Sequence, residues 1–431
     1  MKRFTYILCF LELFSSCIEE VSIEEAIESR FNIEELLIVE ATLTDQLVFQ
    51  EVLLSRGSTF ANEGTTTTES GASVQVIDHL GNSYSFQEEA SGRYISQQAF
   101  AAQQGVRYQL SITTSDNVTY QSEESEISGT SSIDAIYAQR IIEDSGAEGM
   151  AIFVDSSNPA GDLNDFRYTY EETYQIIAPN WTAFEFEIIR EEEENILDPI
   201  TGEVIETLYP DVLLVPRAQE EQVCYNTVLS NDIILSNGVA LTAEQTRGNR
   251  VRFIDRNNTI ISHRYSILVK QFLQSADAAK FYRTLLQFSQ NENLFSEIQP
   301  GLIEGNVTAV GDGEKPVIGF FSVASVTEER LFFNYADFFP DEPLPPYFDD
   351  ANCNRLIAPV LLNPERDGEI PPNVTCGTPL VDLIKSEEIE FFQSNSDPPP
   401  ECQGPYFVTF RECGDCTVYG SNVVPDFWTE E

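Results

Sequence analysis

The stretch GASVQVIDHLGNSYSFQEEASGRYIS, Gly71 to Ser96, decides the fold at the N-terminal end of this chain. Apolar and polar residues alternate within it, as Val74 and Val76 do on either side of Gln75. This period of two is typical of a half-buried β-strand. The turn sequence HLGN at 79–82 separates two such runs and predicts a β-hairpin.

Similar short runs extend in both directions from this hairpin. About seven of them lie between Leu36 and residue 128, and Tyr108, Leu110 and Ile112 repeat the alternation. Short strands at roughly ten-residue spacing predict an Ig-like or transthyretin-like β-sandwich at 36–128. The hairpin stretch resembles the carboxypeptidase-regulatory sandwiches of many surface proteins, which are structural or binding modules. A fold of this kind does not by itself imply an activity.

The sequence ESEISGTSSID marks a domain boundary near Gly129. Beyond it, β-rich runs predict a larger, mostly-β domain at 129–340, interrupted by one helix near 275–290. In SADAAKFYRTLLQFSQ, Ser275 is the predicted N-cap and Asp277 lies in the first turn. The predicted fold class is therefore mainly β, with one α-helix.

The remaining segment, 341–431, is rich in proline and cysteine. We expect it to be loop-like, packed on the second domain and held by covalent links rather than by a core of its own. Six cysteines lie beyond the N-terminal region, and in an exported chain they predict disulfides with 15 possible connectivities: Cys224, Cys353, Cys376, Cys402, Cys413 and Cys416.

The CxxC motif formed by Cys413 and Cys416 allows two alternatives to disulfides. A zinc site would need further thiolate ligands, and a redox pair would stand at the start of a helix that follows a strand. Here a proline-rich loop precedes the motif, and the strand-like residues Thr417 to Tyr419 follow it. This context favours structural disulfides.

The N-terminus predicts export and lipidation. Residues 1–16 have a basic start and a short apolar core ending in Ser15 and Ser16, as in a signal peptide. Cys17 follows directly, as in a bacterial lipobox, although an ordinary signal peptide with an incidental cysteine is the alternative. Glu19 and Glu20 resemble an acidic export signal to the cell exterior, at the start of an acidic tether, 17–35. The expected membrane attachment is through acyl chains alone.

The composition limits the choice of partners. The 431 residues carry a formal net charge of -47, which repels nucleic-acid phosphates and anionic lipid headgroups. We expect no nucleic-acid partner, whereas basic protein surfaces and divalent cations are favoured. A hydrophobic content of 42% is that of a folded chain.

Several motifs together resemble one family. They are YEETYQI from Tyr170, YSILVKQFLQSADAAKFYRTL from Tyr265, LFSEIQPGLIEGNV from Leu294, PVIGFFSVASVTEERLFF from Pro316, and CGDCTVYGSNVVPDFW, which ends at Trp428. The chain is similar to Bacteroidota outer-membrane lipoproteins with a domain of unknown function, often encoded beside SusC-like TonB-dependent receptors. In YGSN the family pattern would have two glycines. The resemblance implies an extracellular accessory subunit of such a receptor or of an outer-membrane assembly barrel.

No sequence motif predicts catalysis or a cofactor. The two histidines, His79 and His263, are far apart in the sequence, and neither HExxH, GxSxG nor a P-loop occurs. The loop DSSNPAGDLND contains three weak calcium candidates, Asp155, Asp162 and Asp165, but lacks EF-hand spacing. With 71 acidic residues, carboxylate pairs at hydrolase spacing arise by chance. We expect a non-catalytic protein; a calcium-dependent glycan-binding module or a surface hydrolase is the alternative.

The last feature is a run of aromatic residues that leads into prolines, LFFNYADFFPDEPLPPYFDD. Phe338, Phe339, Tyr347 and Phe348 are candidates for an exposed docking loop, because aromatic side chains dominate protein interfaces. The alternative is that they pack beneath the cysteine-rich segment.

Overall fold

The computed structural model describes residues 36–57, 67–158, 165–240, 245–290, 303–311, 315–368, 370, 373–396 and 402–430. The predicted signal peptide and tether, with Cys17, Glu19 and Glu20, lie outside these ranges. The chain forms two compact units, described separately below: Met1–Ile127 with Gln287–Ala324, and Ser128–Leu286 with Ser325–Glu431.

The first unit is a β-sheet domain in the strand order β21-β8-β7-β4-β5-β6-β2-β1-β22, with β3 paired to β2. Its apolar side chains form one buried cluster that includes Leu37, Val76, Leu110 and Phe321. The strands are β1 (Leu37–Thr44), β2 (Glu51–Arg56), β3 (Thr67–Thr68), β4 (Ser73–Asp78), β5 (Ser83–Ala90), β6 (Arg93–Ser96), β7 (Tyr108–Thr113), β8 (Thr119–Ser122), β21 (Val307–Ala309) and β22 (Val317–Ala324).

The predicted hairpin is confirmed as β4 and β5. Val74 pairs with Phe86 and Val76 with Tyr84, so the alternating apolar residues share the buried face. The turn is closed by Asp78, whose Oδ1 accepts hydrogen bonds from the backbone N–H of Asn82 at 2.8 Å and of Leu80 at 3.0 Å. Side chains of this type stabilise turns locally.

Two strands that lie within the range predicted for the second domain, 129–340, belong to the first unit. β22 pairs in parallel with β1 over Leu37–Thr44, and β21 pairs with β8. Phe321 and Val323 of β22 complete the buried cluster. Periodicity reveals a strand but not its partner, so the sequence placed this segment with its neighbours along the chain.

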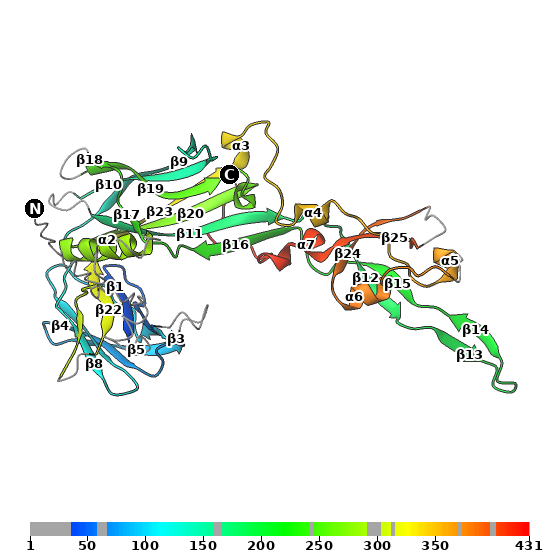
Figure 1. The fold of residues 1–431 in the computed structure, drawn as a ribbon, viewed down its shortest axis with the longest axis horizontal. Coiled ribbons are helices and arrows are strands. Elements are labelled where there is room, and N and C mark those ends of the chain that lie inside the picture. Colours follow the sequence, from blue (N-terminus) through cyan, green and yellow to red (C-terminus); the bar gives the residue numbers. More distant parts are fainter. Residues whose placement is uncertain are drawn as a thin grey trace, which may run out of the picture. The chain divides into compact units, whose positions relative to one another are not determined.

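The second unit contains a four-stranded sheet, β18-β19-β10-β9, and a five-stranded sheet, β16-β11-β20-β23 with β17 beside β11 (Figure 1). Met150 and Ile254 of the first sheet share one buried cluster with Tyr168 and Ile267 of the second, as in a sandwich core. The strands are β9 (Ser132–Ile142), β10 (Glu148–Ser157), β11 (Phe166–Ile177), β16 (Val223–Leu229), β17 (Ile234–Leu235), β18 (Val239–Ala240), β19 (Gln245–Asp255), β20 (Arg264–Leu273) and β23 (Val326–Asn334).

The predicted helix is confirmed as α2 (Ala276–Gln290). Ser275 caps it as expected, since its Oγ accepts the backbone N–H of Ala278 at 3.2 Å. The described residues add short helices that the sequence did not predict: η3 (Thr259–Ile261), α3 (Tyr335–Phe338), α4 (Asp350–Cys353), α5 (Pro364–Asp367), α6 (Leu380–Lys385), α7 (Arg411–Gly414) and η4 (Cys416–Val418).

The C-terminal segment has a core of its own, which corrects the expectation of a loop held by covalent links alone. Its strands β24 (Ile389–Ser394) and β25 (Tyr406–Phe410) pair with each other. A third cluster joins this segment to the ribbon β12 (Phe184–Arg190) and β15 (Asp211–Pro216), whose end is the hairpin β13 (Glu194–Leu197) and β14 (Val204–Leu208). Its buried members are Val212, Leu361, Leu380, Val381, Leu383, Ile389 and Val408.

The mainly β fold class is thus confirmed. In the part of the chain that the structure describes, no helix is both long and apolar enough to cross a bilayer.

Candidate functional site

All six predicted cysteines form disulfides, which confirms that expectation. The pairs are Cys224–Cys416, Cys353–Cys413 and Cys376–Cys402, with separations of 192, 60 and 26 residues along the sequence. The two cysteines of the CxxC motif are therefore bonded to different partners. This pairing rules out both alternatives for the motif, because a zinc site needs free thiolates and a redox pair needs the two sulfurs to bond each other.

Two of the disulfides fix one end of the second unit's larger sheet. Cys224 lies on β16, and Cys353 ends α4. Asn180, just beyond β11, reinforces the second link: its Nδ2 donates to the Cys353 carbonyl at 2.7 Å, and its backbone N–H donates to the Cys413 carbonyl at 2.9 Å. The covalent and hydrogen-bonded links hold the segment around α4 beside the end of β11.

The aromatic segment is anchored at its other end by charged groups. The Glu342 carboxylate forms ion pairs with Arg140 at 2.8 Å and Arg256 at 2.6 Å. Both guanidinium groups also bind Glu148, which lowers the pKa of that carboxyl. The ring of Phe339 lies under Arg140, 4.4 Å from ring centroid to guanidinium carbon, in cation–π geometry.

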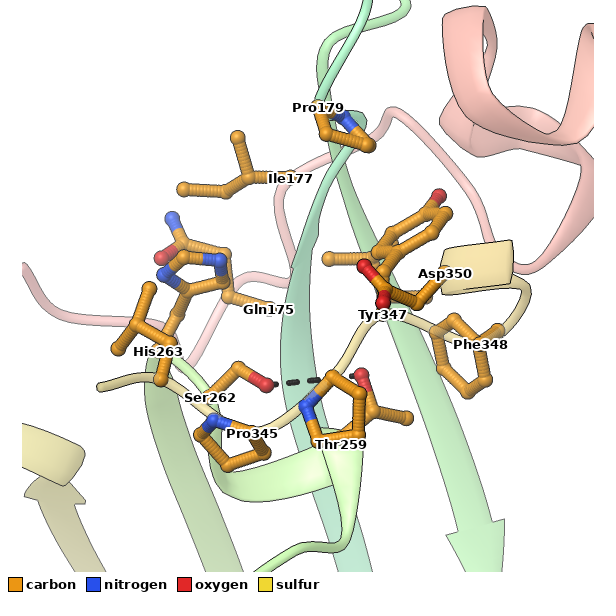
Figure 2. Close-up of a pocket in the computed structure, with 13 residues that line it drawn as sticks. Gln175, Ile177, Pro179, Thr259, Ser262, His263, Pro345, Tyr347, Phe348 and Asp350 are labelled. Atoms are coloured by element: carbon orange, nitrogen blue, oxygen red, sulfur yellow. Dashed lines mark hydrogen bonds between the residues drawn. The ribbon is translucent and has the colours of Figure 1, made fainter. Parts of the chain in front are cut away.

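Between these two anchors the chain borders an open pocket of about 490 Å³. Its walls come from the end of β11, from η3 and the two residues that follow it, and from the proline-rich loop before α4. Figure 2 shows His263 and Gln175 on one side and Tyr347, Phe348 and Asp350 on the other. The apolar part of the lining consists of Ile176, Ile177, Pro179, Leu344, Pro345, Pro346, Tyr347 and Phe348.

The polar groups of the pocket are mostly uncharged. Burial lowers the pKa of His263 below its ordinary value of 6.5, so its imidazole is neutral at pH 7. Within the described ranges, the His263 side chain makes no ion pair or hydrogen bond. The hydroxyls of Thr259 and Ser262 lie 3.5 Å apart beside it, and Asp350 supplies the one carboxylate of the lining.

The rings on the aromatic side contact one another. The rings of Phe348 and Tyr419 are stacked at 4.4 Å between centroids, and Tyr347 meets Tyr419 edge to face at 5.8 Å. Burial raises the pKa of the Tyr347 phenol, so it stays protonated. Neutral hydrogen-bonding groups facing fixed aromatic and proline surfaces suit a ligand that is uncharged and partly apolar.

The four candidates for aromatic docking have different environments. Phe339 is only 1% exposed, and Phe338 is partly buried against the cluster that the second unit's two larger sheets share. Tyr347 and Phe348 line the pocket, and 38% of Phe348 is exposed. The sequence singled out this loop but gave no signal for Gln175 and His263, which line the pocket from distant parts of the chain.

The calcium candidates are engaged in protein contacts. Asp155 Oδ1 accepts the backbone N–H of Gly248 at 2.9 Å, and Asp165 forms an ion pair with Arg283. Asp162 lies outside the described residues. Across the described ranges, no three His, Cys, Asp or Glu side chains gather closely enough to hold a metal ion.

Comparison with known families shows which family the chain belongs to. A family described as a domain of unknown function, DUF4249, matches residues 18–330, more than half of the sequence. The chain belongs to this family. The DUF4249 match starts directly after Cys17 and ends within β23, so it includes one side of the pocket and stops before the aromatic loop. No curated protein matches the sequence.

Proposed function

We propose that this protein is a non-catalytic lipoprotein of the outer membrane, anchored by acyl chains on Cys17 and facing the cell exterior. It serves as an accessory subunit of a SusC-like TonB-dependent receptor or of another outer-membrane barrel. Acyl chains would confine it to the plane of the barrel and raise its effective concentration there, so each contact between them can be weak.

The observation that carries this proposal is the complete pairing of the described cysteines. Three disulfides with long separations indicate folding in an oxidising compartment, because cytosolic thiols stay reduced. They also use every cysteine after Cys17, which leaves Cys17 without a disulfide partner in the exported chain. A lipidated N-terminal cysteine is consistent with that count.

Metabolic labelling with an alkyne fatty acid tests the anchor. Label is expected in the wild type and in the Cys9→Ala variant, whose changed cysteine lies in the predicted signal peptide, but not in Cys17→Ala. The Cys17→Ala protein is also expected to leave the membrane fraction. Label on Cys17→Ala, or its retention in the outer membrane, would overturn the anchor.

Mild-detergent purification from outer membranes, followed by mass spectrometry, tests the accessory role. Stoichiometric recovery of a TonB-dependent receptor or an assembly barrel is the expected result. Recovery of the protein alone would contradict the role.

The pocket favours a second candidate function, the capture of a small uncharged ligand such as a glycan or a short peptide. Its support is the unpartnered, neutral His263 imidazole facing the fixed ring of Phe348. Calorimetric titration of glycan and peptide panels would test it. Binding by the wild type that is lost in Phe348→Ala, and kept in a variant of an equally exposed apolar residue such as Leu53→Ala, is expected.

A further inference from the structure

The ribbon that extends from the second unit's C-terminal cluster, residues 184–216, is called the arm here. In Figure 1, β13 and β14 continue β12 and β15 away from that unit's two larger sheets. The two halves of the arm differ in burial. Val212 on β15 is 1% exposed and packs in the third cluster, whereas every residue of β13 is exposed.

The base of the arm is firmly held. Phe186 and Ile188 of β12 pack against the third cluster, and Lys385 of α6 forms an ion pair with Glu191 at 2.9 Å. Arg190 Nη1 donates to the Tyr209 carbonyl at 2.7 Å, which links the two strands where the free hairpin begins.

The tip is an ordered turn. Asp198 Oδ1 accepts the backbone N–H groups of Ile200 at 2.7 Å and Thr201 at 2.9 Å, and the Asp198 N–H donates to the Glu203 carbonyl at 2.7 Å. Gly202 adopts a φ of 71°, which glycine accommodates without strain. A turn fixed in this way presents its outermost side chain at low entropic cost on binding.

The tip and its flanks are apolar. Ile200 is 93% exposed, and Leu197 and Val204 oppose each other on the hairpin with about half of each side chain in solvent. Scattered apolar surface residues are normal, but a contiguous group is typical of an interaction surface. A two-stranded ribbon is also only marginally stable by itself. The exposed large apolar residues of the arm are Phe184, Ile189, Ile196, Leu197, Ile200, Val204, Ile205 and Leu213.

The negative charge of the arm determines which kind of surface can bind its exposed apolar residues. Residues 184–216 contain ten carboxylates and a single basic residue, Arg190. A second copy of the chain would bring an equally acidic arm, and an anionic lipid surface would repel it as well. A protein surface with lysine and arginine side chains around an apolar centre would complement both the charge and the apolar tip.

We propose that the arm is the docking element for a partner protein whose binding surface is an apolar depression rimmed by basic residues. Ile200 and its apolar neighbours enter the depression, and the carboxylates of the hairpin face the basic rim. This inference deepens the proposed function, on which it rests, by assigning the contact with the partner to one structural element.

Site-specific photo-crosslinking in cells tests the arm directly. The crosslinking amino acid is placed at Ile200 or Ile205 of the full-length protein, and at Leu80 and Val423 as controls, which are similarly exposed and lie outside the arm. A discrete adduct from the arm positions alone is expected. Its crosslinked peptide, identified by mass spectrometry, should map to an apolar surface flanked by lysine and arginine.

Two variants then test the two chemical components. Ile200→Asp is expected to lower adduct formation at Ile205 by about tenfold or more, the loss typical of a central apolar anchor. Glu203→Gln combined with Glu206→Gln should also lower it, and raised salt should do the same to the wild type. The matched control, Glu123→Gln with Glu126→Gln, removes the same charge from exposed positions in the first unit and should leave the adduct unchanged.

The outcomes separate the inference from the proposed function. An adduct on a barrel supports both, whereas an adduct on another protein with the stated surface supports the arm and overturns the barrel as partner. A barrel recovered in detergent without any arm adduct overturns the inference and leaves the proposed function standing. An adduct on a second copy of the chain, or no adduct at all from the arm, also overturns the inference.

Discussion

The buried Tyr265 hydroxyl is expected to stabilise the second unit by a measurable amount, and Tyr265→Phe removes only that group. The hydroxyl donates to Glu172 Oε2 at 2.7 Å, and the ring is fully buried. Arg252 completes the site with two hydrogen bonds to the same carboxylate at 3.1 Å. Burial and the adjacent carboxylate raise the pKa of Tyr265, so the hydroxyl carries its proton throughout the working pH range.

The magnitude follows from the charge of the acceptor. A hydrogen bond to an ionised group contributes about 1.5–3 kcal/mol, because the carboxylate has lost its water. Glu172 keeps both bonds from Arg252 in the variant, so a loss of about 2 kcal/mol in the free energy of unfolding is expected. With a urea slope of about 2 kcal/mol/M, the midpoint should fall by about 1 M.

Tyr347→Phe is the matched control. Its hydroxyl is also buried, but it has no hydrogen-bond partner among the described residues, so its removal should be neutral or slightly stabilising. Both tryptophans, Trp181 and Trp428, lie in the second unit, so their fluorescence during urea unfolding reports on that unit alone. A Tyr265→Phe variant within about 0.5 kcal/mol of the wild type, or equal losses in both variants, would refute the reasoning.

Three further predictions concern residues that line the pocket or hold the loop beside it. Replacing Cys353 and Cys413 together by serine should cost about 4 kcal/mol in urea unfolding, the chain-entropy value for a separation of 60 residues, and an unchanged midpoint would contradict it. Because burial lowers the pKa of His263, the unfolded chain binds the proton first as the pH falls through about 6.5. Stability should therefore decline between pH 7 and pH 5, and His263→Gln should decline less, whereas parallel profiles would exclude this role. Phe339→Ala should lower stability by about 3–5 kcal/mol in the same assay, since it removes a buried ring, and a loss below about 1 kcal/mol would be inconsistent with its burial.

Local features of the fold were readable from sequence because their causes are local. The alternation around Val76 and the turn at Asp78 produce β4 and β5 as expected, and Ser275 caps α2. The predicted export signal and the cysteine count likewise predicted disulfides, but fifteen connectivities were equally allowed. Which cysteines pair depends on distances in the folded chain, as Cys413 and Cys416 show by bonding to different partners.

Only one side of the candidate site could be predicted from the sequence. The aromatic loop that carries Phe348 stood out by composition, whereas His263 and Gln175 were isolated polar residues with no motif around them. They line one pocket because β11 and β20 pair side by side in one sheet and the disulfide of Cys353 holds the loop beside them.

By itself, then, the sequence determined the strands with clear alternation such as β4 and β5, the helix α2, the acidic surface and the cysteines available for bonding, since period, capping and charge act between near neighbours. The tertiary structure alone decided that β22 joins β1, which cysteines bond, and which apolar residues of the arm stay in solvent. These depend on contacts between residues far apart in the chain, where the free energy comes from burial and pairing in three dimensions.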